Sequence, residues 1–386
     1  MERAGRSTSG RVLRYLLAAA LSLMLVGVAA FYGVVMWPLR DPHPKTVPAK
    51  GTLLLTGMRV YTSPDAPVLE HADVLVRDGR IVAVGLESML TSRGFTTVVD
   101  TGSNLRDTVP LRRRIESGEL AGPKIYTAGA AQYPPNGMPY YLRDTLPAWL
   151  LRFLPQPATP TEAADVKRRN IRDGADLLKL FTGSHVARGT VLPMPVENAR
   201  AAVAVAHAAE QPAFAHESNA QGIRVALASG VDVLAHAADS TEGVDEALLR
   251  ELITHHLAMI PTLKMFGTTV TTAPAYWGPI YAEVRRFHEL GGVLVFGTDV
   301  GYRKDSDTGG EFEALTRCGL SGRDILRMLG PAPASKFPEA GNRGTIEIGQ
   351  AADLTVLGGD PIADPRGFAD VRVTIRNGQV IWRRPQ

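Results

Sequence analysis

The segment GADLLKLFTGS at residues 174–184, followed by QPAFAHES at 211–218 and GVDVLAHAAD at 230–239, decides the fold class of this chain. Each contains a short apolar strand, at 176–181, 212–217 and 231–237. Similar runs predict strands at 96–102, 124–129, 258–263 and 292–299, and the segments between predict helices that include 161–173, 196–210, 242–256 and 281–290. Alternating strands and helices predict an α/β protein with a parallel sheet. Seven such strands predict an incomplete, TIM-like (β/α) barrel, one strand short of eight.

The two ends of this region have a different character. Residues 51–85 and 344–382 are rich in β-forming residues, and Asp78-Gly79 and Asn377-Gly378 are typical of hairpin turns. Both ends are therefore predicted to be small β structures outside the barrel.

The N-terminus predicts a membrane segment. Residues 1–14 carry four arginines and one glutamate, which account for the whole net charge of +3, and residues 15–37 are apolar over 23 positions. This predicts a basic cytoplasmic tail (1–14), a transmembrane anchor or signal sequence (15–37) and a Pro-rich linker (38–50). Cleavage after Val28-Ala29-Ala30 is the alternative, which would make the protein secreted rather than anchored. Either way the remainder is expected outside the cytoplasm, at the cell surface or in the periplasm.

The charge distribution also excludes one class of partner. Beyond residue 14 the acidic and basic residues balance. No basic face of the kind that binds nucleic acid is therefore expected.

Four polar residues lie at or near the ends of four predicted strands: Lys179, His216, His236 and Asp299. Side chains alternate along a strand, so Lys179 is expected to point away from the face that carries Leu178 and Leu180. Two imidazoles and a carboxylate at one barrel mouth are a donor set suited to zinc or another divalent metal. Three further residues in loops are candidates for substrate contact: His185, Tyr140 and Tyr141.

These motifs resemble the amidohydrolase superfamily, especially its imidazolonepropionase-like and Xaa-Pro dipeptidase-like branch. The resemblance covers residues 51–382 and includes GRIVAVG at 79–85, TTVVDTGSNL at 96–105, GTD at 297–299 and GTIEIGQAADLTVLGGDP at 344–361. It implies a hydrolase barrel at 86–343, flanked by a β-sandwich built from 51–85 and 344–382.

The resemblance also implies a chemistry. Lys179 would be carboxylated and bridge one or two metal ions, His216 and His236 would bind one ion, and Asp299 would bind the other and transfer protons. A metal-activated water would then attack a C–N bond in a small non-peptide amide, cyclic amide or dipeptide-like substrate.

One feature departs from the family pattern. The His-x-His pair expected at the end of the first barrel strand is absent, and no histidine lies between Gly85 and Thr96. The chain therefore lacks a βα unit of about 30 residues and two ligands of one metal site. Two functional hypotheses follow, a metal-dependent hydrolase that works with the remaining ligands and a degraded or catalytically inactive descendant.

Overall fold

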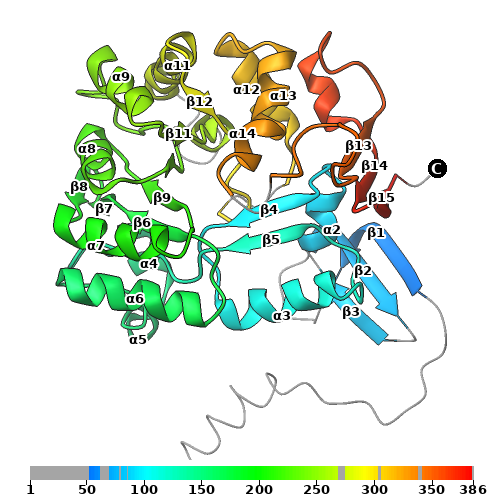
Figure 1. Ribbon diagram of the computed structural model, residues 1–386, viewed down its shortest axis with the longest axis horizontal. Helices are drawn as coiled ribbons and strands as arrows, with labels where there is room; N and C mark the ends of the chain where they lie inside the picture. Colours follow the sequence, from blue (N-terminus) through cyan, green and yellow to red (C-terminus); the bar gives the residue numbers. More distant parts are fainter. Residues whose placement is uncertain are drawn as a thin grey trace, which may run out of the picture. The chain divides into compact units, whose positions relative to one another are not determined.

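A computed structural model describes residues 52–60, 69–77, 80–84, 86–267, 274–302, 306–337 and 341–384 (Figure 1). The predicted tail at 1–14, membrane segment at 15–37 and linker at 38–50 lie outside this range and stay predictions. Within the range, no helix combines the length and apolar character needed to cross a membrane. By internal contacts the chain divides into two units, Met1–Leu54 with Leu75–Val82, and Leu55–Val74 with Ala83–Gln386.

The larger unit contains the seven predicted strands, all in parallel pairs. They are β4 (Thr97–Asp100), β5 (Lys124–Thr127), β6 (Leu178–Phe181), β9 (Ala213–His216), β10 (Val233–Leu234), β11 (Ala258–Met259) and β12 (Val293–Leu294). β4 pairs with β5, a bridge from Gln132 to Leu180 joins the segment after β5 to β6, and the order continues β6-β9-β10-β11-β12. The sequential parallel order confirms the predicted α/β barrel architecture.

The barrel has a gap at the predicted place. The short helix α2 (Leu86–Thr91) precedes β4, and no strand lies between Leu86 and Thr96. Among the described residues no ladder joins β4 to β12. The ends of this seven-strand arc nevertheless lie close together, because the rings of Phe95 and Phe296 stack at 5.8 Å.

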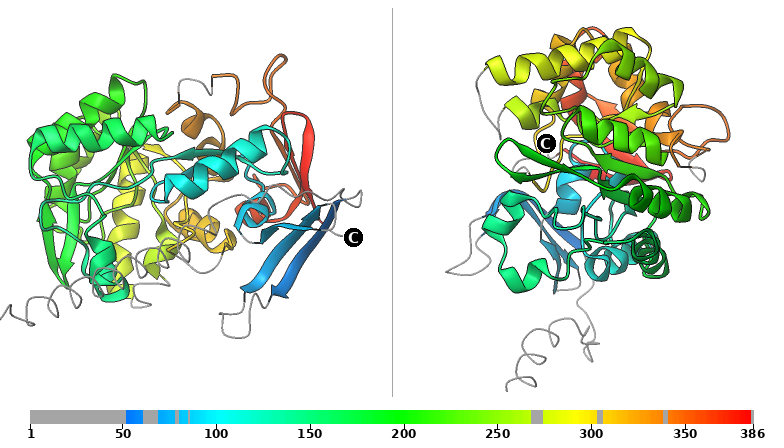
Figure 2. Two further views of the ribbon diagram at one scale, coloured as in Figure 1. Left: turned by 90° about the horizontal axis from the view of Figure 1, so that it is seen from below. Right: turned by 90° about the vertical axis from the view of Figure 1, so that its left-hand side faces the viewer.

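Helices follow the strands and cover their outer side. The longer ones are α3 (Leu105–Glu116), α6 (Pro160–Arg172), α7 (Val196–His207), α8 (Ala220–Ser229), α9 (Glu246–Thr254), α11 (Pro274–Glu289), α12 (Gly309–Arg317) and α13 (Gly322–Leu329). Helices α6 and α7 lie side by side, as Figures 1 and 2 show. Side chains fix several starts, since Thr159, Asn219 and Asp245 accept backbone N–H groups of the first turns of α6, α8 and α9. The predicted helices at 161–173, 196–210, 242–256 and 281–290 correspond to α6, α7, α9 and α11.

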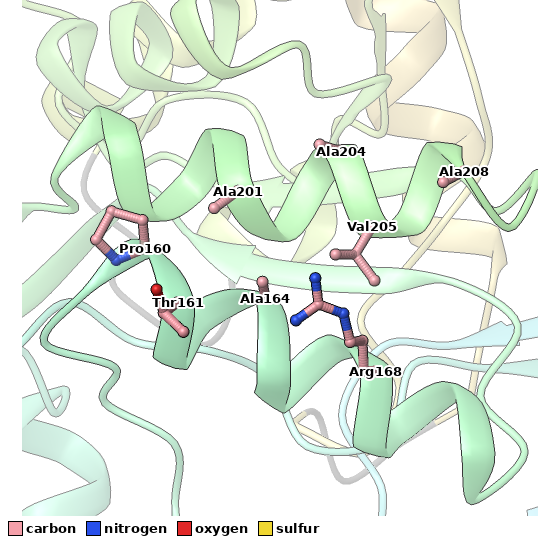
Figure 3. A pocket seen from close by; sticks show the side chains of 8 residues that line it. All are labelled: Pro160, Thr161, Ala164, Arg168, Ala201, Ala204, Val205 and Ala208. Carbon is pink, nitrogen blue, oxygen red and sulfur yellow. The ribbon is translucent and has the colours of Figure 1, made fainter.

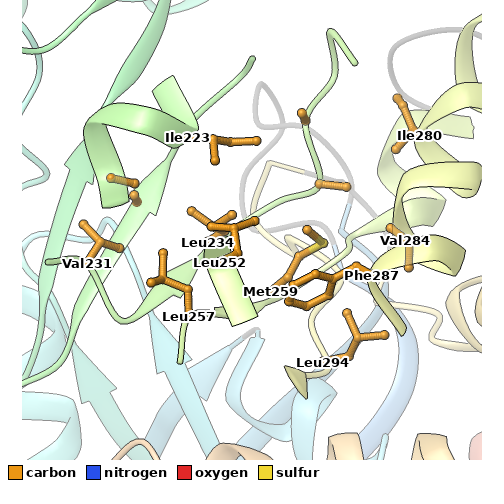
Figure 4. Packing of buried hydrophobic residues seen from close by; sticks show 14 of the residues in the cluster. Ile223, Val231, Leu234, Leu252, Leu257, Met259, Ile280, Val284, Phe287 and Leu294 are labelled. Atoms are coloured by element: carbon orange, nitrogen blue, oxygen red, sulfur yellow. The ribbon is translucent and has the colours of Figure 1, made fainter. Parts of the chain in front are cut away.

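Two apolar layers follow from strand alternation. An inner cluster includes Leu177, Phe214, Val233 and Ala258. In the outer layer the alternate strand residues pack against the helices (Figure 4). The strands contribute Leu178, Leu180, Leu234, Met259 and Leu294, and the helices contribute Ile223, Leu252, Val284 and Phe287. Each fully buried side chain of this size contributes about 1.5–3 kcal/mol. Lys179, between Leu178 and Leu180, therefore lies on the inner face, as predicted.

Both predicted β regions contain strands, although 344–353 has none and the predicted Asp78-Gly79 turn lies outside the described residues. Strands β1 (Thr52–Val60), β2 (Leu69–Arg77) and β3 (Arg80–Val84) form one sheet, and β13 (Leu354–Leu357), β14 (Val371–Arg376) and β15 (Gln379–Arg383) form another. Asn377 and Gly378 have φ of 49° and 76°, the left-handed conformation that a tight hairpin turn requires. That the two sheets form one sandwich stays a prediction.

Candidate active site

The four predicted site residues lie at or beyond the carboxyl ends of parallel strands. Lys179 is within β6, His216 ends β9, His236 follows β10 by two residues and Asp299 follows β12 by five. Since β6, β9, β10, β11 and β12 are parallel neighbours, these ends share one edge of the sheet. The strand order thus gathers residues that are up to 120 positions apart in sequence.

The two histidines are in contact. Their ring centroids lie 4.7 Å apart with the planes at 74°, and Phe181 stacks on His216 at 4.6 Å. His236 Nδ1 lies 2.9 Å from the Thr262 hydroxyl, which follows β11. This contact fixes the orientation of the His236 ring and leaves Nε2 as its available nitrogen.

Burial keeps both imidazoles neutral. It lowers the pKa of His216 and His236 well below 6.5, and the neighbouring Lys179 charge lowers both further. Neutral imidazole is the form that binds a metal ion, because its second nitrogen has a free lone pair.

Lys179 lies beside these rings and beside two carboxylates. Burial lowers the pKa of the lysine, whereas the charges of Glu217 and Asp299 act in the opposite direction. Its Nζ lies 5.7 Å from the Phe181 ring centroid. Asp299 has a φ of 56°, a left-handed conformation uncommon outside glycine, at the point where the chain leaves the sheet. Lys179, His216 and His236 therefore lie together at one edge of the sheet, and Asp299 lies near enough for its charge to act on Lys179. That these four residues form the site stays a prediction.

The three candidates for substrate contact lie around the same site. His185, in the strand β7 (Gly183–Ala187) of the hairpin after β6, has its Nε2 2.6 Å from Asp239 Oδ2. Tyr140 and Tyr141 begin α4 (Tyr140–Thr145), and the Tyr141 ring meets Tyr302 edge-on at 6.1 Å. Burial raises the pKa of Tyr141, and the charges of Asp299 and Asp239 add to this effect.

Sequence reasoning missed three carboxylates beside these residues: Glu217, Asp239 and Glu283. Glu217 follows His216 directly and Asp239 lies three positions after His236, so both were within the quoted motifs. Glu283, in α11, accepts a hydrogen bond from the Ala238 amide at 3.3 Å. Its sequence signal was a glutamate between apolar residues on the inward face of a helix.

The side chains at this site limit which metal centre they could form. No group of three His, Cys, Asp or Glu side chains converges on a metal position within the described ranges. One or two ions were predicted, and two would need the missing His-x-His pair, so the residues present do not fit a binuclear site. They fit one ion if Lys179 supplies an anionic oxygen, because His216 and His236 are neutral and adjacent.

A separate hollow of about 570 Å³ lies between helices α6 and α7 (Figure 3). Its lining includes Pro160, Ala164, Arg168, Ala201 and Val205, and none of the strand-end residues. It lies on the outer helical layer and has no part in the candidate site.

Comparison with solved structures supports the fold. A Xaa-Pro dipeptidase with bound methionine superposes with a TM-score of 0.68 and 19% identity, covering 86% of this chain and 100% of that one. A putative prolidase from Bifidobacterium longum has a TM-score of 0.63 and 23% identity, and the match covers 87% of this chain and 96% of that one. For A. niger ochratoxinase the TM-score is 0.65 and the identity 16%, and the match covers 83% of this chain and 93% of that one. A sequence search of curated proteins finds no match.

The comparison with family models is decisive, because the model of the amidohydrolase family matches residues 80–381, most of the chain. The sequence-based resemblance is thereby confirmed. This protein belongs to the amidohydrolase family.

Proposed function

We propose that the protein hydrolyses a C–N bond in a small amide-type substrate, using one divalent ion, zinc being the first choice, held by His216, His236 and a carboxylated Lys179. The observation that carries the proposal is the contact between the two neutral imidazoles at 4.7 Å beside a lysine that is itself buried. The similar structures support the reaction class, since they are named as a Xaa-Pro dipeptidase, a prolidase and an ochratoxinase.

Carboxylation would resolve the charge problem at Lys179. An ammonium group beside two metal-binding imidazoles would repel the ion. Burial lowers the pKa of Lys179 and so favours its neutral amine. The amine nitrogen adds to carbon dioxide and loses a proton, which replaces the cation by a carbamate anion with two oxygen donors.

The remaining residues have distinct roles in this proposal. A bound ion would supply an activated water and would polarise the substrate carbonyl. Asp299 lies close enough to Lys179 for its charge to act on the lysine. It would take the proton from the attacking water and pass it to the leaving nitrogen. Thr262 would hold His236 so that Nε2 faces the site.

The experiment measures metal content and hydrolysis together. The purified full chain is analysed for bound metal and assayed with N-acyl amino acids and Xaa-Pro dipeptides. We expect about one equivalent of metal and measurable hydrolysis, with both lost in His216→Asn. The matched control is His207→Asn, because His207 is an exposed residue of α7 that pairs with Asp232 outside the site.

The alternative is a non-catalytic descendant of the family, favoured by the absent His-x-His pair and the gap in the barrel. A folded protein that binds no metal would refute metal-dependent hydrolysis. Metal binding without turnover of any tested amide would favour the non-catalytic alternative.

A further inference from the structure

Three carboxylates with unpartnered oxygens gather beside the candidate site. Glu217 is fully buried at 0% exposure, and neither of its side-chain oxygens has a hydrogen-bond partner. Glu283 is 6% exposed with Oε2 unpartnered, and Asp239 Oδ1 is buried without a partner. Such groups are costly to bury, so each calls for a ligand or another specific reason.

The three carboxylates lie on neighbouring segments. The Ser240 N–H donates to the Ser218 carbonyl at 3.0 Å, which joins the segment after Asp239 to the segment after Glu217. The Ala238 N–H, next to Asp239, donates to Glu283 at 3.3 Å. Among the described residues, the cationic side chains beside them include Lys179, which pairs with Phe214 of β9, and His185, whose Nε2 lies 2.6 Å from Asp239 Oδ2. Carboxylation of Lys179 would remove one of these cations, which makes the surroundings more acidic.

Tyrosine rings extend the same cluster. Tyr276 of α11 and Tyr141 of α4 lie within the range of the Asp239 charge. Tyr141 contacts Tyr140 at 5.7 Å and Tyr302 at 6.1 Å, both edge-on. Tyr302 is 51% exposed, so its ring is accessible from solvent. Aromatic rings beside carboxylates are the surroundings that favour an organic cation.

One of these rings already receives a cation from the protein. The guanidinium of Arg188 lies 5.7 Å from the Tyr140 ring centroid. Among the described residues, no cation lies over the ring of Tyr141, Tyr276 or Tyr302.

We propose that Asp239, Glu217 and Glu283, with Tyr141, Tyr276 and Tyr302, recognise a protonated or quaternary amine on the substrate. This inference rests on the proposed function and specifies its substrate class as an amide that carries a cationic group. A second metal ion is the competing ligand. It would need several donors about 2.0–2.6 Å from one point, and no three such side chains converge among the described residues. An ammonium group against aromatic faces tolerates longer contacts.

The test measures binding without turnover. Choline is the probe, and 3,3-dimethylbutan-1-ol is its neutral isostere, and both are titrated calorimetrically into the full-length protein at constant ionic strength. We expect choline to bind at least about tenfold more tightly than the isostere, which corresponds to the upper range of a cation–π contribution. The preference should be lost in Asp239→Asn.

Asp239→Asn also removes the contact with His185, so a second variant is needed. Tyr302→Leu replaces an exposed ring, which the fold should tolerate, and should weaken choline binding several-fold. Asp165→Asn is the matched control, because Asp165 pairs with Arg168 on the surface of α6, and it should bind choline as the wild type does.

The outcomes separate this inference from the proposed function. Equal affinity for choline and its isostere, or no choline binding, would overturn the inference even in an active hydrolase. Selective choline binding by a protein without metal or turnover would support the amine site and count against the hydrolase.

Discussion

Replacing Glu283 by glutamine should make the protein more stable, and increasingly so as the pH rises. Burial raises the pKa of this carboxyl from its ordinary value of 4.5 to about 8. Between these two values the folded state holds a proton that the unfolded state releases, so stability falls as the pH rises through this window. Above about pH 8 the folded carboxyl is also ionised, so the stability no longer falls as the pH rises.

The magnitude follows from the pKa difference. At pH 7, about 2.5 pH units above the unfolded pKa, the unfolded carboxyl is ionised, whereas the folded carboxyl is still mostly protonated. The free energy of unfolding of the wild type is therefore lowered by about 3 kcal/mol. At pH 5 the same reasoning gives less than about 1 kcal/mol. Glutamine cannot ionise, and its oxygen can still accept the Ala238 N–H. Glu283→Gln should therefore be more stable than the wild type by about 3 kcal/mol at pH 7, and nearly equal at pH 5.

Urea unfolding at pH 5 and pH 7, followed by circular dichroism, measures both differences. Glu289→Gln is the matched control on the same helix, since Glu289 is exposed and pairs with Arg286. It should change the unfolding free energy by no more than about 0.5 kcal/mol at either pH. A stability difference for Glu283→Gln that does not grow between pH 5 and pH 7 would refute the reasoning. Although Glu283 is protonated in the folded protein at pH 7, a bound cation would favour its ionised form. If the inferred amine site is correct, the same substitution should therefore also weaken choline binding.

Two further predictions concern the structure around the site. Gly222→Ala should lower the unfolding free energy by about 1–3 kcal/mol or more, because the added Cβ would lie 1.8 Å from the Glu217 carbonyl oxygen. The control Gly278→Ala, in α11, adds a Cβ that meets open space and should stabilise the protein by up to about 1 kcal/mol. Equal melting temperatures of the two variants would contradict this reasoning. Lys167→Met should cost about 1–3 kcal/mol, since Lys167 Nζ donates to the Leu177 carbonyl at 2.9 Å and to Gln211 Oε1 at 2.6 Å. The control Lys336→Met, at a bond to the His256 carbonyl, should show little change in the same urea titration.

The sequence predicted the barrel strands and the four strand-end residues because both depend on local patterns. Lys179 and His216 are in phase with the inner-face residues Leu177 and Phe214, so alternation determines the face of the sheet on which they lie. His236 lies two residues beyond β10 and is in phase with the outward-facing Leu234, so the sequence predicts only its place at the strand end. The gap before β4 could be predicted for the same reason, since a missing motif is visible in the chain itself.

The acidic and aromatic cluster could not be predicted in this way. Glu283 reaches Ala238 from a helix 45 residues downstream, and Tyr141 and Tyr302 meet across 161 positions. Loops and helix faces are positioned by tertiary packing, which short motifs do not encode. Glu217 was visible in the sequence, but its unpartnered oxygens are a property of the folded surroundings.

The gap in the barrel and the absence of the His-x-His pair have one cause. The missing strand would lie between β4 and β12, whose facing edges have no ladder between them among the described residues. Its carboxyl end would lie at the same edge of the sheet as Asp299, and that is where the His-x-His pair of the family pattern belongs. One inserted βα unit would therefore pair two open strand edges and add two imidazoles beside Asp299. Because a single absence accounts for both deficits, a variant that restored only the histidines, without a strand to carry them, should recover neither barrel closure nor a second metal ion.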